Sequence, residues 1–288
     1  MTSTTLLVNP SISQISKTSY FIMPLGLLSI AAYLRENGFP VEILDFNVVK
    51  RKSPLGTDQD ILSKFSTTID EIAPKVLGIS IMVAGQLKIA YEAIKIAKAK
   101  NPQIVTMIGG AHSSQFPREI LENCPEIDFV VLGEGELQSA AIVKNYSGKY
   151  TFQEFPEGIA FRENGTVKIN KRIAFLESID RLPFPAYDLL EFSDYSHDTK
   201  NWHNPNKVDL TNRVPIITSR GCPNACNFCS ISQSMGYCYR PMSATRVVDM
   251  IQMLYEKNNS RVFAVYDANF TQDHNRIIAI CNEITNVI

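Results

Sequence analysis

The sequence predicts an α/β protein in which a doubly wound parallel sheet is followed by the beginning of a second β/α domain. Two observations carry this prediction. Short, almost wholly apolar runs alternate with amphipathic helical segments through residues 1–146, as in a parallel sheet that is covered by helices on both faces. After a polar stretch that ends near residue 210, the same alternation begins again.

The elements of the first domain follow from this periodicity. Strands are expected at Thr5–Asn9, Val41–Asp45, Val76–Met82, Ile104–Ile108 and Phe129–Leu132. Helices are expected at Leu25–Asn37, Asp60–Ala73, Leu87–Lys100 and Glu136–Asn145. Asp58 or Asp60 is the expected cap of the second helix. This alternation predicts a flavodoxin-like or Rossmann-like sheet, whose ligands lie at the carboxyl ends of the strands.

The character of the sequence changes after residue 146. Asn164-Gly165, between apolar segments at Gly158–Arg162 and Val167–Asn170, predicts a hairpin. A linker with Pro183 and Pro185 follows. The second domain is expected to hold strands at Val214–Thr218 and Arg261–Tyr266 and helices at Ala244–Lys257 and Asn275–Ile288. We therefore divide the chain into a first domain at 1–146, a hairpin and linker at 147–210, and a second domain at 211–288.

The composition argues against several classes of partner. Lys and Arg number 28 and Asp and Glu number 29, so the net charge is −1 and gives no electrostatic reason to expect nucleic acid or an anionic membrane. The longest uncharged stretch, residues 18–34, contains Pro24 and Gly26, which makes a membrane span unexpected. Six cysteines are too sparse for a disulfide scaffold. We expect a cytoplasmic protein.

Three of the cysteines form the most informative motif. Cys222, Cys226 and Cys229 directly follow the expected strand Val214–Thr218, and Pro223 indicates that they lie on a loop. Thiolates on such a loop can hold an iron–sulfur cluster, and clusters that only transfer electrons usually have four cysteine ligands. Three ligands would leave one iron open to a substrate, as in an open catalytic zinc site.

Other uses of these thiols remain open at this stage. A structural zinc site would need a fourth ligand, and no His lies between Asn204 and His274. The remaining cysteines, Cys124, Cys238 and Cys281, have no partner motif. A disulfide is disfavoured in a reducing compartment. Zinc is therefore the main alternative to iron.

At these residues the chain resembles a known family. Cys222, Cys226 and Cys229, with Phe228 before the last, are similar to the signature of the radical S-adenosylmethionine superfamily. Together with Ser219–Pro223, they resemble the subgroup that has an N-terminal cobalamin-binding domain. Its other recurring segments are similar to Met23–Leu27, Gly109–His112, Gly133–Glu136, Leu182–Asp188 and Asp267–Thr271.

The resemblance implies roles for named residues. The three cysteines would ligate a 4Fe–4S cluster, whose open iron would bind S-adenosylmethionine. Backbone near Phe228 would meet the adenine, and Asp267 and Asn269 would hold the amino group or the ribose. Arg240 would face the carboxylate of that cofactor or pair with a surface acid. Cobalamin would lie on two glycine turns, at the following residues: Gly109, Gly110, His112, Gly133 and Gly135.

The chain also departs from the family pattern. The corrinoid signature Asp-x-His-x-x-Gly is absent after the first strand, where residues 9–13 contain no His, so cobalamin would lack a lower axial ligand from the protein. Ala268 replaces the second of two adjacent acids. The residues after Val214 suffice for two β/α units at roughly 30 residues each, fewer than a family core has. We therefore expect a fragment of a longer architecture.

The function implied by the resemblance is that of a radical S-adenosylmethionine enzyme. It would cleave this cofactor reductively for methyl transfer or for rearrangement or cyclisation of a small molecule. Its electron donor would be external, such as a flavodoxin or a ferredoxin. The alternatives are a non-catalytic corrinoid-binding fragment and a zinc protein. A methylthiotransferase-like relative would need three cysteines in its first domain, which has only Cys124.

Overall fold

The computed structural model describes residues 4–12, 22–145, 157–170, 175–196 and 207–287. The chain divides into two compact units. The first consists mainly of Gly26–Phe175, and the second mainly of Leu176–Phe184 and Leu190–Ile288. Each unit is described by itself below.

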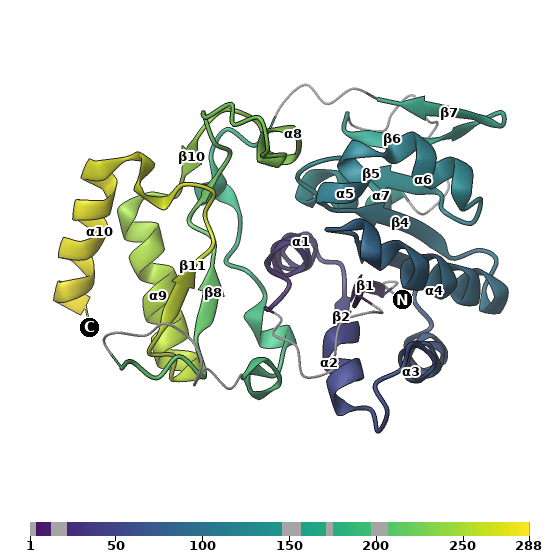
Figure 1. The fold of residues 1–288 in the computed structure, drawn as a ribbon, viewed down its shortest axis with the longest axis horizontal. Coiled ribbons are helices and arrows are strands. Elements are labelled where there is room, and N and C mark those ends of the chain that lie inside the picture. Colours follow the sequence, from purple (N-terminus) through teal and green to yellow (C-terminus); the bar gives the residue numbers. More distant parts are fainter. Residues whose placement is uncertain (1–3, 13–21, 146–156, 171–174, 197–206, 288) are drawn as a thin grey trace. The chain divides into compact units, whose positions relative to one another are not determined.

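The first unit contains a seven-stranded sheet (Figure 1). Its order is β2 (Val41–Asp45), β1 (Thr5–Asn9), β3 (Val76–Ser80), β4 (Val105–Gly109), β5 (Phe129–Val131), β6 (Ile159–Glu163) and β7 (Thr166–Ile169). The first five strands are parallel, and β6 and β7 are antiparallel. The predicted doubly wound parallel sheet is confirmed, with the flavodoxin-like strand order.

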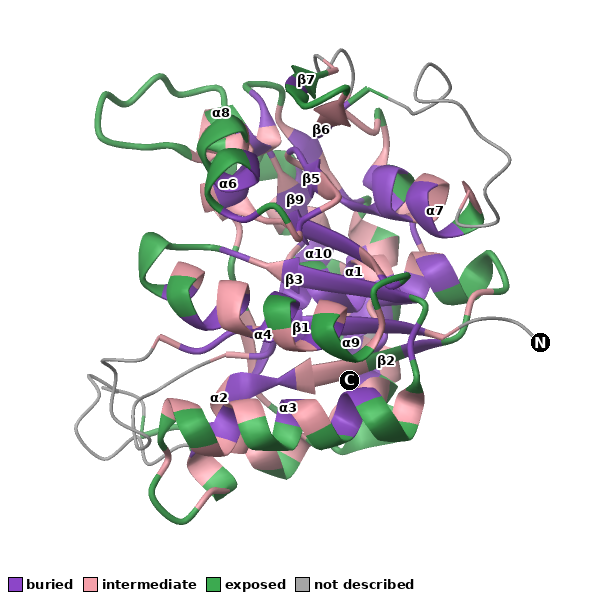
Figure 2. Cartoon of the chain, turned by 90° about the vertical axis from the view of Figure 1, so that its right-hand side faces the viewer, coloured by how far each residue is buried: buried purple, intermediate pink, exposed green. Residues whose placement is uncertain are grey.

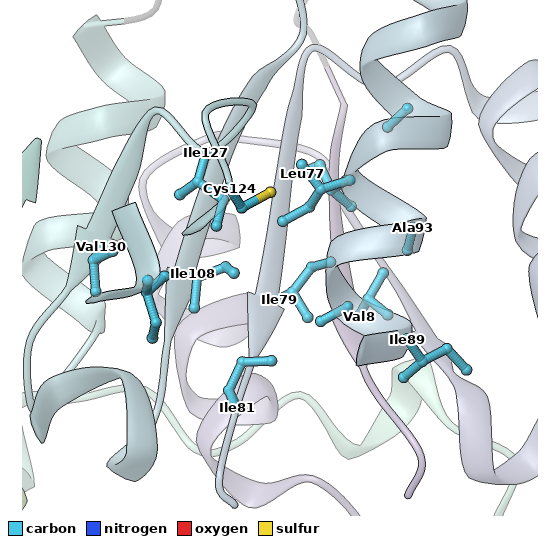
Figure 3. Close-up of a cluster of buried hydrophobic side chains, with 14 of the residues drawn as sticks. Val8, Leu77, Ile79, Ile81, Ile89, Ala93, Ile108, Cys124, Ile127 and Val130 are labelled. Atoms are coloured by element: carbon cyan, nitrogen blue, oxygen red, sulfur yellow. The ribbon is translucent and has the colours of Figure 1, made fainter. Parts of the chain in front are cut away.

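Helices cover both faces of this sheet. They are α1 (Leu25–Glu36), α2 (Phe46–Lys52), α3 (Asp58–Ile72), α4 (Leu87–Lys100), α5 (Ala111–Gln115), α6 (Pro117–Asn123) and α7 (Glu136–Asn145). Side chains of α3, α4 and α6 form one apolar cluster with the sheet, and side chains of α1 and α7 form another. The strands between the two clusters are largely buried (Figure 2). Figure 3 shows part of the first cluster, where Leu77 and Ile79 of β3 lie beside the helix α4, which carries Ile89 and Ala93.

Two details differ from the sequence analysis. The hairpin β6–β7, which was grouped with the linker, pairs with β5 and extends the sheet of the first unit. The cap of α3 is Thr57, not Asp58 or Asp60. The Thr57 hydroxyl accepts a hydrogen bond from the Asp60 amide at 3.1 Å, and the Asp60 carboxylate accepts one from the Thr57 amide at 2.9 Å. Asp60 thus completes a capping box at the third helical position.

The second unit is built on two parallel strands, β8 (Val214–Ile216) and β11 (Phe263–Val265), with the helices α9 (Ala244–Asn258) and α10 (His274–Val287). A short antiparallel pair, β9 (Ser219–Arg220) and β10 (Arg240–Pro241), and the helix α8 (Ile231–Met235) lie between β8 and α9 in sequence. Short 3-10 helices lie at Ala84–Gln86, Ile179–Arg181, Tyr187–Leu189, Phe192–Tyr195 and Phe270–Gln272.

The linker segment 176–184 packs within the second unit. The Asp180 carboxylate accepts a hydrogen bond from the Ser243 amide at the start of α9. Arg246 donates to the Leu182 carbonyl and lies 4.3 Å above the centre of the Phe184 ring. Among the residues that the structure describes, every helix is too short or too polar to cross a bilayer.

Candidate functional site

The cysteine motif lies on a single loop, Gly221–Tyr239, which we call the cysteine loop. The antiparallel pair β9–β10 joins its two ends, with Arg220 opposite Arg240. The Cys222 amide donates a hydrogen bond to the Gly236 carbonyl at 3.2 Å, and the Cys229 amide donates one to the Cys226 carbonyl at 3.0 Å. The loop is therefore tied both at its base and within the motif.

Glycine is required at the start of this loop. Gly221 has φ +77°, and a Cβ atom there would lie 2.0 Å from the Cys238 carbonyl oxygen. Only glycine allows such an approach of two backbone segments. The close packing of residues 221 and 238 fixes the direction in which the chain enters the motif at Cys222.

The three thiols are free and open to solvent. Cys222 is partly exposed, and Cys226 and Cys229 are exposed. In the described part of the chain, no three His, Cys, Asp or Glu side chains are close enough together to hold one metal ion. In a 4Fe–4S cluster each thiolate ligand binds a different iron, so three unpaired thiols on one accessible loop can hold three of the irons without meeting at one point. Phe228, 93% exposed, lies among them.

Asp267 and Asn269 follow β11, as predicted, but their contacts are within the protein. One Asp267 carboxylate oxygen accepts from the Thr218 amide at 2.6 Å. The other accepts from the hydroxyls of Thr218 and Ser219, both at 2.7 Å. The Asn269 side-chain amide donates to Gln272. Asp267 therefore links the end of β11 to the backbone that leads into the cysteine loop.

Arg240 is placed beneath the cysteine loop. Its side chain is buried, with 5% exposure. The guanidinium donates to the carbonyls of Leu176 and Met235 at 2.9 and 2.8 Å. These contacts connect the linker segment to the end of α8 and support the shape of the loop.

The first glycine turn lies at the carboxyl ends of β3 and β4. Gly110 has φ +101°, and a Cβ atom there would lie 2.5 Å from the Ile81 carbonyl oxygen. The Ile81 amide donates to the Gly109 carbonyl, and the His112 amide donates to the Ile81 carbonyl. The His112 ring stacks on Phe116, with the ring centres 4.9 Å apart. The turn thus presents backbone, not side chain, at the edge of the sheet.

The second glycine turn follows β5. The Gly133 amide donates to the Ser114 hydroxyl at 2.7 Å, which joins the two glycine turns. Gly135 lies against Ile30, whose Cδ1 would be 2.6 Å from a Cβ atom at this position. Glu136 begins α7, as expected, and its carboxylate accepts a hydrogen bond from the Ser29 hydroxyl at 2.5 Å.

The sequence analysis missed Gln86, which ties two strand ends together. Its side-chain carbonyl accepts from the amides of Met82 and Val83, and its amide donates to the Pro10 carbonyl at 2.6 Å. Met82 and Val83, whose backbone amides are fixed by these hydrogen bonds, are 54% and 46% exposed. A glutamine just before an expected helix was the available signal, but the Pro10 carbonyl that it binds is 76 residues away in sequence.

A further polar atom lies after β1. The Ser11 hydroxyl is buried and has no hydrogen-bond partner among the described residues. The carboxyl edge of the sheet therefore carries exposed apolar side chains, the backbone of two glycine turns, and a hydroxyl without a hydrogen-bond partner among the described residues. This is the edge at which parallel α/β sheets bind ligands.

Comparison with known proteins finds a family model for the first part and relatives over most of the chain. A model of the B12 binding domain matches residues 15–143. Cytidylyl-2-hydroxyethylphosphonate methyltransferase of Streptomyces wedmorensis is 30% identical, over 93% of this chain and 55% of the relative. Anaerobic magnesium-protoporphyrin IX monomethyl ester cyclase of Rubrivivax gelatinosus is 28% identical, over 91% of this chain and 44% of the relative.

The fold also matches a solved structure. The radical S-adenosylmethionine methyltransferase TsrM of Kitasatospora setae, solved with cobalamin and a 4Fe–4S cluster bound, aligns with a TM-score of 0.71 and 18% identity. The alignment covers 99% of this chain and 52% of that protein. The chain spans about half the length of the curated relatives it matches.

Proposed function

Because this chain belongs to the family of radical S-adenosylmethionine proteins with a B12-binding domain, we propose that it serves a cobalamin-dependent methyl transfer to a small molecule. One observation carries the proposal. The same chain holds a loop with three free thiols after β8 and a sheet with open glycine turns at its carboxyl edge. The cysteine loop suits an iron–sulfur cluster, and the glycine turns suit cobalamin.

The cysteine loop is the proposed cluster site. Thiolates of Cys222, Cys226 and Cys229 would each hold one iron, and the exposure of the loop leaves room for S-adenosylmethionine beside them. When bound, the cluster supplies the electron that cleaves this cofactor, and cobalamin supplies a carrier for the methyl group. The role of the chain is to hold the three thiolates on one loop whose two ends are tied together.

The carboxyl edge of the first sheet is the proposed cobalamin site. The backbone at Gly110 and Gly133 can approach a large ligand closely, because neither residue carries a side chain. Met82 and Val83 offer apolar surface, and the Ser11 hydroxyl offers an unused hydrogen bond. Residues 9–12 contain no His, in keeping with cobalamin held without a lower ligand from this loop.

The proposed function also implies an electron-donor partner and a reducing compartment. Thiols that must stay reduced to bind iron suit the cytoplasm. The reaction also needs a one-electron donor, such as a flavodoxin or a ferredoxin. The exposed position of Cys226, Phe228 and Cys229 supports electron entry at the cysteine loop.

Anaerobic reconstitution with iron and sulfide tests the cluster site. We expect the wild-type chain to bind iron and to change its visible spectrum when S-adenosylmethionine is added. Cys226→Ala should abolish this spectrum, whereas Cys281→Ala, which removes an exposed thiol from α10, should leave it unchanged. Full iron content in Cys226→Ala would contradict the ligand assignment, and corrinoid binding without iron uptake would favour the non-catalytic alternative.

Labelled S-adenosylmethionine distinguishes methyl transfer from cyclisation. The reconstituted chain is loaded with hydroxocobalamin, reduced, and incubated with S-adenosylmethionine that carries ¹³C in its methyl group. We expect the label to appear on the bound corrinoid in wild type and to be absent in Cys226→Ala. Cleavage to 5′-deoxyadenosine with no label on the corrinoid would instead favour a rearrangement or cyclisation.

A further inference from the structure

A single side chain of α10 holds both ends of the cysteine loop. The Arg276 guanidinium is buried and donates from Nη2 to the Thr218 carbonyl at 2.8 Å and from Nε to the Met242 carbonyl at 2.7 Å. Thr218 immediately precedes β9, and Met242 immediately follows β10. A third contact, from Nη1 to the Tyr239 hydroxyl at 3.3 Å, reaches the last residue of the loop.

The Thr218 peptide is fixed from both sides. Its carbonyl accepts from Arg276 and from the Met242 amide at 2.8 Å. Its amide and hydroxyl donate to Asp267 at the end of β11. Two residues of the second β/α repeat, Asp267 and Arg276, therefore set the backbone three residues before Gly221 and four before Cys222. Neither has to touch a cofactor to control where the first thiol lies.

Among the described residues, neutral groups surround the Arg276 charge, including the Phe270 ring, whose centre lies 5.9 Å from the guanidinium. In the described part of the chain its guanidinium contacts two carbonyls and one phenol hydroxyl, and no carboxylate. Arginine stays protonated in proteins, so a positive charge is retained at the base of the cysteine loop. Positive charge near an iron–sulfur cluster favours its reduced state, since net charge and hydrogen bonding set the potential.

We propose that Arg276 is a positioning residue for the cluster: it holds the two ends of the cysteine loop together and raises the reduction potential of the group that the loop binds. The inference rests on the proposed function, because it concerns the same three thiolates. It assigns separate effects to the two properties of the side chain. The planar guanidinium binds two carbonyls at once and so holds the two ends of the loop together, and its positive charge raises the reduction potential of the cluster.

Two substitutions separate these properties. Arg276→Lys keeps the charge, but a single ammonium cannot reproduce the paired hydrogen bonds of the guanidinium. Arg276→Met removes both. Arg246→Met is the matched control, because Arg246 also donates from a helix of this unit to a backbone carbonyl, that of Leu182, outside the cysteine loop. Each full chain is reconstituted anaerobically, challenged with an iron chelator, and titrated to obtain its midpoint potential.

The expected pattern differs between the variants. Both Arg276 variants should lose iron to the chelator about 10- to 100-fold more readily than wild type, the range seen for residues that support metal ligands. The midpoint potential should fall in Arg276→Met and stay near the wild-type value in Arg276→Lys. Arg246→Met should match wild type in both measurements. A purely structural role for Arg276 would lower thermal stability without moving the potential.

The outcomes that overturn the proposal are distinct from failure of the proposed function. Wild-type iron retention in Arg276→Lys would show that the paired hydrogen bonds of the guanidinium do not hold the cysteine loop. This variant tests that claim even if Arg276→Met does not fold. An unchanged potential in a folded Arg276→Met would overturn the effect of the charge. If wild type binds no iron, the proposed function fails. Limited proteolysis of the cluster-free chain then tests whether the Arg276 guanidinium holds the loop: cleavage within 222–238 should be faster in Arg276→Lys than in Arg246→Met. Equal cleavage rates would contradict this role of Arg276.

Discussion

The two units of this chain hold their sites in different ways. In the first unit, β1 and β3 have four buried residues out of five each, between apolar clusters on both faces of the sheet. In the second, β8 is buried but no residue of β11 is, and Val265 and Ile278 are 37% and 48% exposed. The apolar core is thus far more complete around the first site.

The difference shows which interactions should matter in each unit. At the edge of the first sheet, the site is backbone held in place by the packing of the strands below it. At the cysteine loop, the backbone is held by polar contacts from Asp267, Arg276 and Arg240. Apolar truncation should therefore damage the first unit most, and loss of a polar contact should damage the second.

The largest effect is expected from a truncation in the first sheet. Leu77 is fully buried in β3, so Leu77→Ala should lower the free energy of unfolding of this unit by about 2–5 kcal/mol, because it leaves a cavity. Val265→Ala in β11 removes a partly exposed side chain and should cost clearly less. Urea unfolding measures both. Equal losses for the two variants would contradict the contrast between the units.

A smaller effect is expected at the first glycine turn. Gly110→Ala would place a Cβ 2.5 Å from the Ile81 carbonyl in a conformation that costs other residues about 1–3 kcal/mol. It should weaken hydroxocobalamin binding more than it lowers stability, because the turn lies at the edge of the sheet. Gly26→Ala in α1 meets no atom within 4 Å and should be neutral or stabilising. Binding is followed by equilibrium titration, and unchanged affinity in Gly110→Ala would remove this turn from the proposed site.

Much of the first unit could be predicted because its strands are short apolar runs with clear ends. β1, β2, α4 and α7 have the expected bounds. The short helices α2, α5 and α6 could not be predicted, since five to seven residues show too little periodicity. The pairing of the hairpin with β5 could not be predicted either, because a turn signal gives the hairpin but not its neighbour in the sheet.

The site was predictable in its residue types but not in its contacts. Pro223, soon after an apolar strand, placed Cys222, Cys226 and Cys229 correctly on a loop. The assignment of Asp267 and Arg240 to the cofactor stays a prediction, and the structure adds hydrogen bonds that both make within the protein, which the sequence did not indicate. Arg276 was missed, because its partners Thr218 and Met242 are 58 and 34 residues away. Such contacts follow from tertiary packing and have no local pattern.

The last expected effect appears only at alkaline pH, and it distinguishes the buried thiol of the first unit from the exposed thiols of the second. Burial, and a hydrogen bond from the Cys124 thiol to Glu126, raise the pKa of Cys124 to about 11. A pKa that is higher in the folded state gives stability that is complete below the unfolded value of about 8.5 and is lost as the pH rises through the folded value. The first unit should therefore lose stability between about pH 9 and 11.

Cys124→Ala should show a shallower loss of stability over this range than wild type, and Cys281→Ala, at an exposed site, should show the wild-type slope. Identical slopes for the three proteins in urea unfolding at pH 8 to 11 would show that the Cys124 thiol does not titrate with folding.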